Sequence, residues 1–380
     1  MTVLCLELVK TSWSHISTET RRKGNERNLR EPGDFRDRDY LETVEGLFFT
    51  VVGNSHPDDR VLAYLKYFPS PQGKWKRHMQ NFDRAIKFYD IPHLSETIKF
   101  ISSRYPHYLY NDRLLHISFT AVPTENVRTH HLPEEKLRIL GERSELDTLQ
   151  RKTVNLAFAL SKKSGVELER FGVTGSLLID VHQLAFSDID LTTYGKNHGL
   201  AVRRALLETF DSQDPHITRV KGEDTPTPAR QSRLRLMNED QLRLFYERKW
   251  NRGLFMGTPF SVNPVLEPSD PQERYGQYRY IPIDMVEVRA SVTDASESIF
   301  VPAKYRVSDT RVTSGKQAEA IKEIVSYDRD YGDIAFEGEK ILVRGKLERV
   351  EDTLTLSSHH RIVVGSLEGR GADYIKVDAQ

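Results

Sequence analysis

Two aspartates separated by one residue, Asp188 and Asp190, could chelate a divalent metal ion. Ile189 and Leu191 alternate with them, which is the pattern of a strand with one polar face and one buried face. Because successive side chains of a strand point to opposite faces, the two carboxylates would share one face, with their Cα atoms about 6.6 Å apart. Mg²⁺ prefers oxygen ligands and usually binds phosphate as well as carboxylates. The pair therefore predicts a metal-assisted reaction at a phosphate.

A Gly-Ser pair, Gly175-Ser176, precedes these aspartates and follows an apolar segment. Gly175 permits a tight turn or a close backbone approach, and Ser176 could cap a following helix and face an anion. Two further Asp-X-Asp pairs lack this context, Asp37/Asp39 in a charged run and Asp328/Asp330 in a turn-like segment. The alternative interpretation of Asp188 and Asp190 is a polar edge strand without chemistry.

These residues resemble the signature of the DNA polymerase β-type nucleotidyltransferase superfamily, over roughly residues 145–295. In that signature a Gly-Gly or Gly-Ser pair precedes two acids that alternate with apolar residues. Thr174 departs from it, because an apolar residue usually precedes the glycine. The layout is also similar to that of uncharacterised archaeal predicted nucleotidyltransferases, in which this site lies between two other modules.

The resemblance implies roles for four residues. Gly175 and Ser176 would contact the β- and γ-phosphates of a nucleoside triphosphate. Asp188 and Asp190 would hold Mg²⁺ or Mn²⁺. The resemblance thus implies an enzyme with a metal cofactor and a nucleotide substrate.

The resemblance also implies a third catalytic acid on a later strand, for which we select Asp284. The first strand expected after the intervening helices, 258–266, offers Ser261 and Asn263 at its inward polar positions. The following strand offers Asp284 or Glu287. Asp284 could equally be a surface acid on a half-buried strand. Without a third carboxylate, catalysis would be weak or absent.

Arg203 and Arg204, on a helix expected over 199–210, could clamp a phosphate by their charge. The ordinary alternative for both is a solvent-facing position. The two adjacent histidine pairs do not chelate alone, because neighbouring side chains diverge on a strand or helix. The sequence contains no Gly-x-x-x-x-Gly-Lys-Ser/Thr loop, Gly-x-Ser-x-Gly elbow or His-Glu-x-x-His motif.

The composition limits the classes of protein that the chain could be. Its 55 basic and 55 acidic residues leave no overall field for nucleic acid, so binding would depend on local patches. The single cysteine, Cys5, excludes an internal disulfide and a cysteine-rich metal site. There is no apolar run of membrane-spanning length, and the N-terminus is a poor signal peptide. We therefore expect a soluble, cytoplasmic protein without a membrane partner.

We predict a multidomain α+β fold with a polymerase β-like α/β core. Its four parts are a disordered or loosely ordered extension (1–39), a small α+β module (40–132), the nucleotidyltransferase domain (133–296) and an OB-like β-barrel (297–380). The extension is polar and charged, so it could not bury enough surface to order itself.

The pattern of apolar residues predicts the elements of each part. The N-terminal module should contain a hairpin (46–52 and 61–68), helices at 82–89 and 94–101 and a strand at 114–122. The central domain should contain helices over 133–161, a strand at 167–173, a lid-like loop at 211–231 and a helix at 241–250. The barrel should contain strands at 299–307, 341–350, 353–356 and 361–365, with a helix near 317–325.

The function that we expect is transfer of a nucleoside monophosphate from a triphosphate to an acceptor hydroxyl on RNA or another nucleic acid. The alternative is a catalytically degenerate protein that keeps the scaffold and binds RNA or single-stranded nucleic acid. The sequence leaves open the nucleotide, the acceptor and the oligomeric state.

Overall fold

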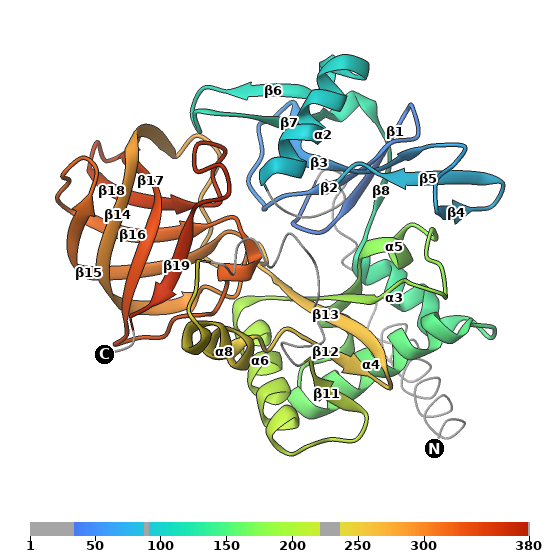
Figure 1. Cartoon of the computed structure of the whole chain (residues 1–380). Coiled ribbons are helices and arrows are strands. Elements are labelled where there is room, and N and C mark those ends of the chain that lie inside the picture. Colours follow the sequence, from blue (N-terminus) through green and yellow to red (C-terminus); the bar gives the residue numbers. More distant parts are fainter. Residues whose placement is uncertain (1–33, 87–90, 221–235, 379–380) are drawn as a thin grey trace.

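The computed structural model describes residues 34–86, 91–220 and 236–378. Three β-sheets, each with its own buried core, form three modules (Figure 1). Residues of all three modules line one cavity. The fold is mixed α and β, as the sequence predicts, and it is built from several modules. No helix in the described ranges is long and apolar enough to cross a membrane.

The N-terminal module is an eight-stranded sheet with one main helix. Its elements are β1 (Tyr40–Thr43), β2 (Phe48–Val51), β3 (Arg60–Pro69), β4 (Trp75–Arg77), β5 (Gln80–Arg84), α2 (Ile91–Arg104), η1 (Pro106–Tyr108), β6 (Leu109–Asp112), β7 (Ile117–Pro123), η2 (Thr124–Asn126) and β8 (Val127–His131). The expected hairpin is confirmed, because β2 and β3 pair antiparallel. Val61, Ala63 and Leu65 of β3 pack with Ile101 of α2 on one face of this sheet. Leu62, Tyr64 and Lys66 line the cavity on the other face.

Two predictions for this part of the chain are wrong. Residues 80–84 form strand β5 rather than the start of a helix, because Phe82 is buried between Trp75 of β4 and Pro69 of β3. The end of the expected extension is ordered, since Asp37, Arg38 and Asp39 are buried. Asp39 accepts hydrogen bonds from the Arg36 amide and His130 Nε2. The rest of the extension, 1–33, lies outside the described residues.

The central module is a five-stranded sheet in the order β11-β12-β13-β10-β9. Its strands are β9 (Phe171–Val173), β10 (Ile189–Tyr194), β11 (Ile217–Arg219), β12 (Arg252–Phe255) and β13 (Thr258–Val265). Its helices are α3 (Pro133–Glu142), α4 (Thr148–Ser164), η3 (Leu168–Arg170), α5 (Gly175–Leu178), α6 (Lys196–Asp211) and α8 (Glu239–Arg248). Strand β11 lies within the stretch 211–231 expected to be a loop, of which 221–231 falls outside the described residues.

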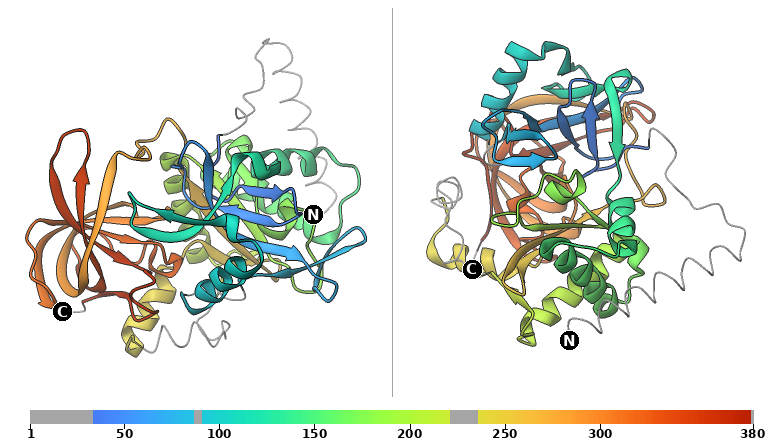
Figure 2. Two further views of the ribbon diagram at one scale, coloured as in Figure 1. Left: turned by 90° about the horizontal axis from the view of Figure 1, so that it is seen from above. Right: turned by 90° about the vertical axis from the view of Figure 1, so that its right-hand side faces the viewer.

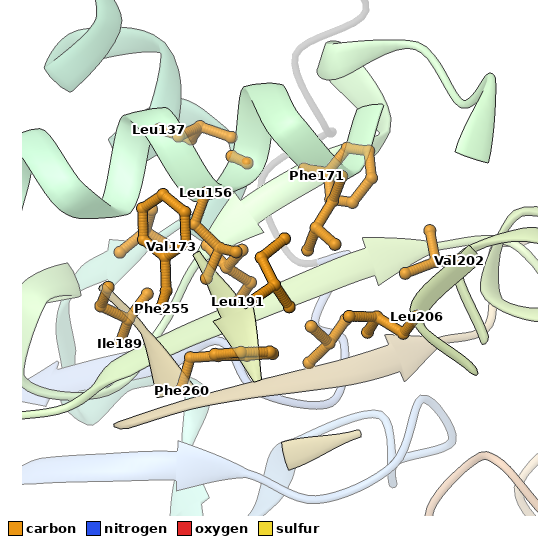
Figure 3. Packing of buried hydrophobic residues seen from close by; sticks show 14 of the residues in the cluster. Leu137, Leu156, Phe171, Val173, Ile189, Leu191, Val202, Leu206, Phe255 and Phe260 are labelled. Atoms are coloured by element: carbon orange, nitrogen blue, oxygen red, sulfur yellow. The ribbon is translucent and has the colours of Figure 1, made fainter. Parts of the chain in front are cut away.

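One face of the central sheet is apolar and packs against α3, α4 and α6 (Figure 3). Ile189 and Leu191 of β10 meet Leu156 of α4 and Leu206 of α6 in this core, and all four are fully buried. Each such side chain contributes roughly 1.5–3 kcal/mol by leaving water. Asp147 caps α4 in a reciprocal capping box with Gln150, which fixes where this helix begins. The opposite face of the sheet is thus left for polar side chains.

The C-terminal module is a small β-barrel. Its elements are β14 (Tyr278–Glu297), β15 (Ala303–Ser314), β16 (Ile321–Ser326), η5 (Arg329–Tyr331), β17 (Lys340–Asp352), β18 (Ser358–Val364) and β19 (Tyr374–Val377). The order is β14-β15-β16-β18-β17, and pairing of β14 with β17 closes the ring. The pair β16–β18 is parallel, and the other pairs are antiparallel.

Two expected elements of the barrel are wrong. Residues 321–326 form strand β16 instead of a helix, since the buried Ile321, Ile324 and Val325 lie between β15 and β18. Residues 353–356 form a turn between β17 and β18 rather than a strand, and Leu354 and Leu356 are largely exposed there. A run of alternating apolar residues predicts a strand only where a partner sheet exists to bury them.

The three modules are joined by specific contacts. The N-terminal sheet packs through Tyr40, Phe48 and Tyr67 against Leu178 of α5. On the barrel side, Arg248 of α8 forms a bidentate ion pair with Glu339, in which both N–O distances are 2.6 Å. Figure 2 shows the same arrangement from two further directions, with α8 beside the barrel.

Candidate functional site

Asp188 and Asp190 lie at the start of β10, on the polar face of the central sheet. Ile189 and Leu191 are fully buried on the opposite face, so the alternation predicted from the sequence is confirmed. Asp190 is half-buried, whereas Asp188 is exposed to the cavity. In the parallel pairing of β10 with β13, Asp190 stands beside Ser261.

The Gly-Ser turn touches the second aspartate directly. Gly175 has φ +70°, a backbone conformation that residues with a side chain rarely adopt. A Cβ at this position would overlap the Oδ2 atom of Asp190. The Thr174 amide donates to the Asp190 carbonyl at 2.9 Å. Ser176 is buried and its hydroxyl lies 3.4 Å from that of Ser187. Two motifs that are separate in the sequence therefore form one structure.

The electrostatic state of the pair is unusual. The negative charge of Asp190, followed by burial, raises the pKa of Asp188 to about 6. The charges of Arg84 and Lys66 act in the opposite direction, and lower this pKa. Like charges held this close are relieved by a cation, which is the electrostatic requirement of a metal site.

The third acid predicted from the sequence is not beside the pair. Asp284 is exposed on β14 of the barrel, where its carboxylate accepts hydrogen bonds from the Lys316 and Met285 amides. Glu287, the other candidate, accepts hydrogen bonds from Tyr374 and Thr313 in the same barrel. The prediction is wrong because it assigned β14 to the central sheet, whereas β14 pairs with β15 and β17.

A serine and an asparagine occupy the neighbouring positions of β13. Ser261 Oγ donates to Asp190 Oδ1 at 2.5 Å, and Asn263 Nδ2 donates to Ser261 Oγ at 3.0 Å. No group of three or more Asp, Glu, His or Cys side chains that could hold a metal occurs in the described part of the chain. The repelling carboxylate pair fits one hard cation, with water or phosphate oxygens as its other ligands.

The two arginines predicted to clamp phosphate lie away from this site. Arg203 of α6 forms an ion pair with Asp333 and covers the ring of Phe336. Arg204 is exposed on the same helix. Helix α6 packs on the apolar face of the sheet, and neither arginine lines the cavity. Their proximity to the aspartates in sequence is therefore misleading, because the sheet lies between them.

The cations that line the cavity together with the aspartates include Arg38, Lys66, Arg84 and Arg329. Three of them come from the N-terminal module and Arg329 comes from η5 of the barrel module. Sequence reasoning missed them because they belong to other modules. The sequence contains one indication, because Lys66 interrupts an otherwise apolar strand. A lysine is rarely buried unless an oppositely charged group or a ligand accompanies it.

Arg38 is fixed in place by the central module. Its backbone has φ +75°, a conformation that costs about 1 kcal/mol or more for a residue with a side chain. Its carbonyl accepts a hydrogen bond from Thr174 Oγ1 at 2.8 Å. Its side chain donates to Asn263 Oδ1 at 2.7 Å and pairs with Asp37. The chain segment before β1 is thus attached to both the Gly-Ser turn and β13.

The cavity into which these groups project has a volume of about 1610 Å³. All three modules contribute to its wall, including Tyr278, Tyr280 and Arg361 from the barrel. The guanidinium of Arg361 lies 3.5 Å from the ring centre of Tyr280 and pairs with buried Glu348. A space of this size could hold a nucleotide together with part of a second substrate.

The chain is similar in sequence to an archaeal protein over most of its length. The chain is 31% identical over 348 residues to the uncharacterized protein MJ1086 of Methanocaldococcus jannaschii. The matched part covers 90% of this chain and 98% of the relative. This chain belongs to the family of that protein.

The family relation extends to the architecture but supplies no activity. The unmatched tenth of the chain is shorter than any of the three modules, so the relative shares at least part of each. No family model matches the chain. No solved structure matches it.

Proposed function

We propose that this protein is a metal-dependent nucleotidyltransferase of the DNA polymerase β type. The observation that supports this best is the contact of the Gly175 turn with Asp190 at the start of β10. That contact places the Gly-Ser turn directly behind two carboxylates that line the cavity and are suited to a metal. The expected polymerase β-like core and its relation to archaeal predicted nucleotidyltransferases form part of this proposal.

In the proposed reaction an acceptor hydroxyl attacks the α-phosphate of a nucleoside triphosphate. A new P–O bond forms, the α–β phosphoanhydride bond breaks, pyrophosphate leaves with the bonding electrons, and the hydroxyl proton passes to water. Asp188 and Asp190 would hold Mg²⁺ or Mn²⁺, which would neutralise charge on the phosphate oxygens. Ser261 orients the Asp190 carboxylate through its hydrogen bond. Gly175 leaves the space in which the Asp190 carboxylate lies beside the turn.

The acceptor that we propose is a hydroxyl of RNA or another nucleic acid. The barrel supports this choice, because a ring of five strands in the order β14-β15-β16-β18-β17 with one parallel pair matches the OB arrangement. OB barrels commonly bind oligonucleotides. Tyr278 and Tyr280 of this barrel line the cavity, where a base could stack on an aromatic ring.

A second candidate function is binding of nucleic acid without catalysis. It is favoured by Ser261 and Asn263, which stand on β13 where a third carboxylate would complete the site. Such a protein would bind RNA or single-stranded DNA with a strong dependence on salt concentration. It would release no pyrophosphate with any metal or nucleotide.

Pyrophosphate release separates the two functions. The wild-type protein would be incubated with each of the four nucleoside triphosphates, Mg²⁺ or Mn²⁺ and total cellular RNA, beside the Asp188→Asn/Asp190→Asn variant. Release by the wild type that is lost in the variant supports the enzyme. Binding of RNA without release under any condition supports the second function. Circular dichroism of the variant checks that its fold is intact.

A further inference from the structure

Four positively charged side chains converge on the aspartate pair from outside the central module. Lys66 and Arg38 are buried, and Arg84 and Arg329 are half-buried. All four line the cavity that also contains Asp188 and Asp190. Arg38 pairs with Asp37 within this cluster, and a further anion between the four cations would reduce the repulsion among their charges.

The positive charges of this cluster affect the pKa of a neighbouring tyrosine, Tyr64. Burial alone would raise the pKa of the Tyr64 hydroxyl, but the charges of Lys66, Arg329 and Arg38 outweigh burial and lower this pKa. Burial, together with the charges of Arg84 and Arg329, lowers the pKa of Lys66 to about 8, although the charges of Tyr64 and Asp190 act to raise this pKa. The cations therefore repel one another in spite of the nearby aspartates.

The positions of these cations are set by the fold. Lys249, at the end of α8, donates to the carbonyls of Arg329 and Gly332 at 3.1 and 3.0 Å, which fixes η5 against the end of this helix. The Asp328 carboxylate accepts a hydrogen bond from the Asp330 amide within the same turn. Arg84 ends β5, and its buried Nε has no hydrogen-bond acceptor among the described residues. These side chains form a prepared site for an anion.

We propose that Arg38, Lys66, Arg84 and Arg329 bind the polyphosphate of the nucleotide, and that the divalent metal enters together with the polyphosphate. This inference rests on the proposed function and assigns its triphosphate site to the N-terminal and barrel modules. The positive charges of these side chains, which line the same cavity as the aspartate pair, would repel a bare metal ion there. A polyphosphate neutralises them and supplies oxygen ligands, so it strengthens metal binding.

A polyphosphate fits this cluster better than a polynucleotide backbone does. The four cations line the same cavity as the aspartate pair, and the charges of Arg38 and Lys66 interact with those of Arg329 and Asp190. They come from β3, β5, η5 and the segment before β1. A run of phosphodiesters carries one charge per nucleotide along an extended path, and needs a groove with cations spaced along it. A triphosphate concentrates its charge within a few ångströms.

Calorimetric titration tests the inference in the full-length protein. The probes are inorganic tripolyphosphate with and without Mg²⁺, Mg²⁺ alone, and a short oligouridylate. We expect tripolyphosphate to bind, and Mg²⁺ to bind at least ten-fold more tightly with tripolyphosphate present. Lys66→Met and Arg329→Gln should each weaken tripolyphosphate binding ten-fold or more, since each removes a charge-assisted contact.

Arg204→Gln is the matched control, because it removes one positive charge outside the cavity. It should leave tripolyphosphate affinity unchanged. Thermal unfolding identifies a variant that fails to fold. Arg329→Gln should lower the stability less than Lys66→Met, because Arg329 is half-buried and Lys66 is buried.

Two results would overturn the inference. One is an unchanged tripolyphosphate affinity in both folded variants together with weaker oligouridylate binding, which would make the cluster a polynucleotide site. The other is equal Mg²⁺ affinity with and without tripolyphosphate. Tripolyphosphate binding that depends on these cations, in a protein that never releases pyrophosphate, would support the anion site while contradicting the proposed transferase activity.

Discussion

At the scale of single residues, the contact between Gly175 and Asp190 determines whether the two motifs can form one site. Gly165, at the end of α4, has nearly the same backbone conformation, φ +71°, but nothing lies within 4 Å of where its Cβ would be. Substitution of either glycine strains the backbone, but only substitution of Gly175 places a Cβ against Asp190, so a comparison of the two variants distinguishes these effects.

Gly175→Ala should abolish activity, whereas Gly165→Ala should retain it. Both substitutions introduce strain of about 1 kcal/mol or more, and only the first displaces the Asp190 carboxylate. Pyrophosphate release and urea unfolding would be measured for both variants. Equal activity of the two would show that the contact at Gly175 is irrelevant to the reaction.

The pH dependence of kcat/KM should have a maximum between about 6 and about 8. Asp188, whose pKa is raised to about 6 chiefly by Asp190, must lose its proton to bind a metal, so activity rises with pH through this value. Lys66, whose pKa burial lowers to about 8, must keep its proton to bind phosphate, so activity falls above this value. Lys66→Arg should remove the alkaline decline. A flat profile from about pH 5 to 9 would exclude these roles.

At the scale of elements, the sequence predicts best where a residue pattern and its packing partner lie close together in the chain. The alternation in β10, the hairpin β2–β3 and the helices α4, α6 and α8 are of this kind. Strands β5 and β16 were expected to be helical, because their short apolar runs suit both structures and only the partner strands decide.

The candidate site follows the same rule. Asp188, Asp190 and Gly175 could be predicted because one segment contains them. Lys66 and Arg329 could not, because the docking of three modules brings them there. Asp284 was selected on the assumption that successive strands belong to one sheet, and that assumption fails where the barrel begins.

The contact of α6 with the barrel should contribute to stability rather than to catalysis. Arg203→Ala leaves the buried carboxylate of Asp333 without its partner and should lower the free energy of unfolding by roughly 1–3 kcal/mol. Adding Asp333→Asn should recover part of this loss. Arg204→Ala, on the exposed side of the helix, should change stability by no more than about 0.5 kcal/mol. A similar loss for Arg203→Ala and Arg204→Ala in urea unfolding would contradict this assignment.

At the scale of the whole molecule, one cavity of about 1610 Å³ unites residues from three modules. The central module supplies the aspartate pair, the N-terminal module supplies Arg38, Lys66 and Arg84, and the barrel supplies aromatic side chains and further charged residues, Arg329 among them. The archaeal relative matches this chain over 98% of its own length, so it shares at least part of each of the three modules.

Ligands that bind between modules should stabilise all of them together. A nucleoside triphosphate with Mg²⁺ at a hundred times its dissociation constant should add about 2.7 kcal/mol to the free energy of unfolding. Thermal unfolding with Mg²⁺ alone, nucleotide alone and both would show the largest shift with both. The Asp188→Asn/Asp190→Asn variant should lose the additional effect of the metal. An equal shift with the metal alone would contradict joint binding.

The most direct test of the central claim is pyrophosphate release by the wild type and by the Asp188→Asn/Asp190→Asn variant. Each of the four nucleoside triphosphates would be supplied with Mg²⁺ or Mn²⁺ and total cellular RNA. A transferase should release pyrophosphate with at least one nucleotide, and the variant should lose this activity by orders of magnitude while it remains folded. Release that persists undiminished in the folded variant would show that the two aspartates are not the catalytic centre.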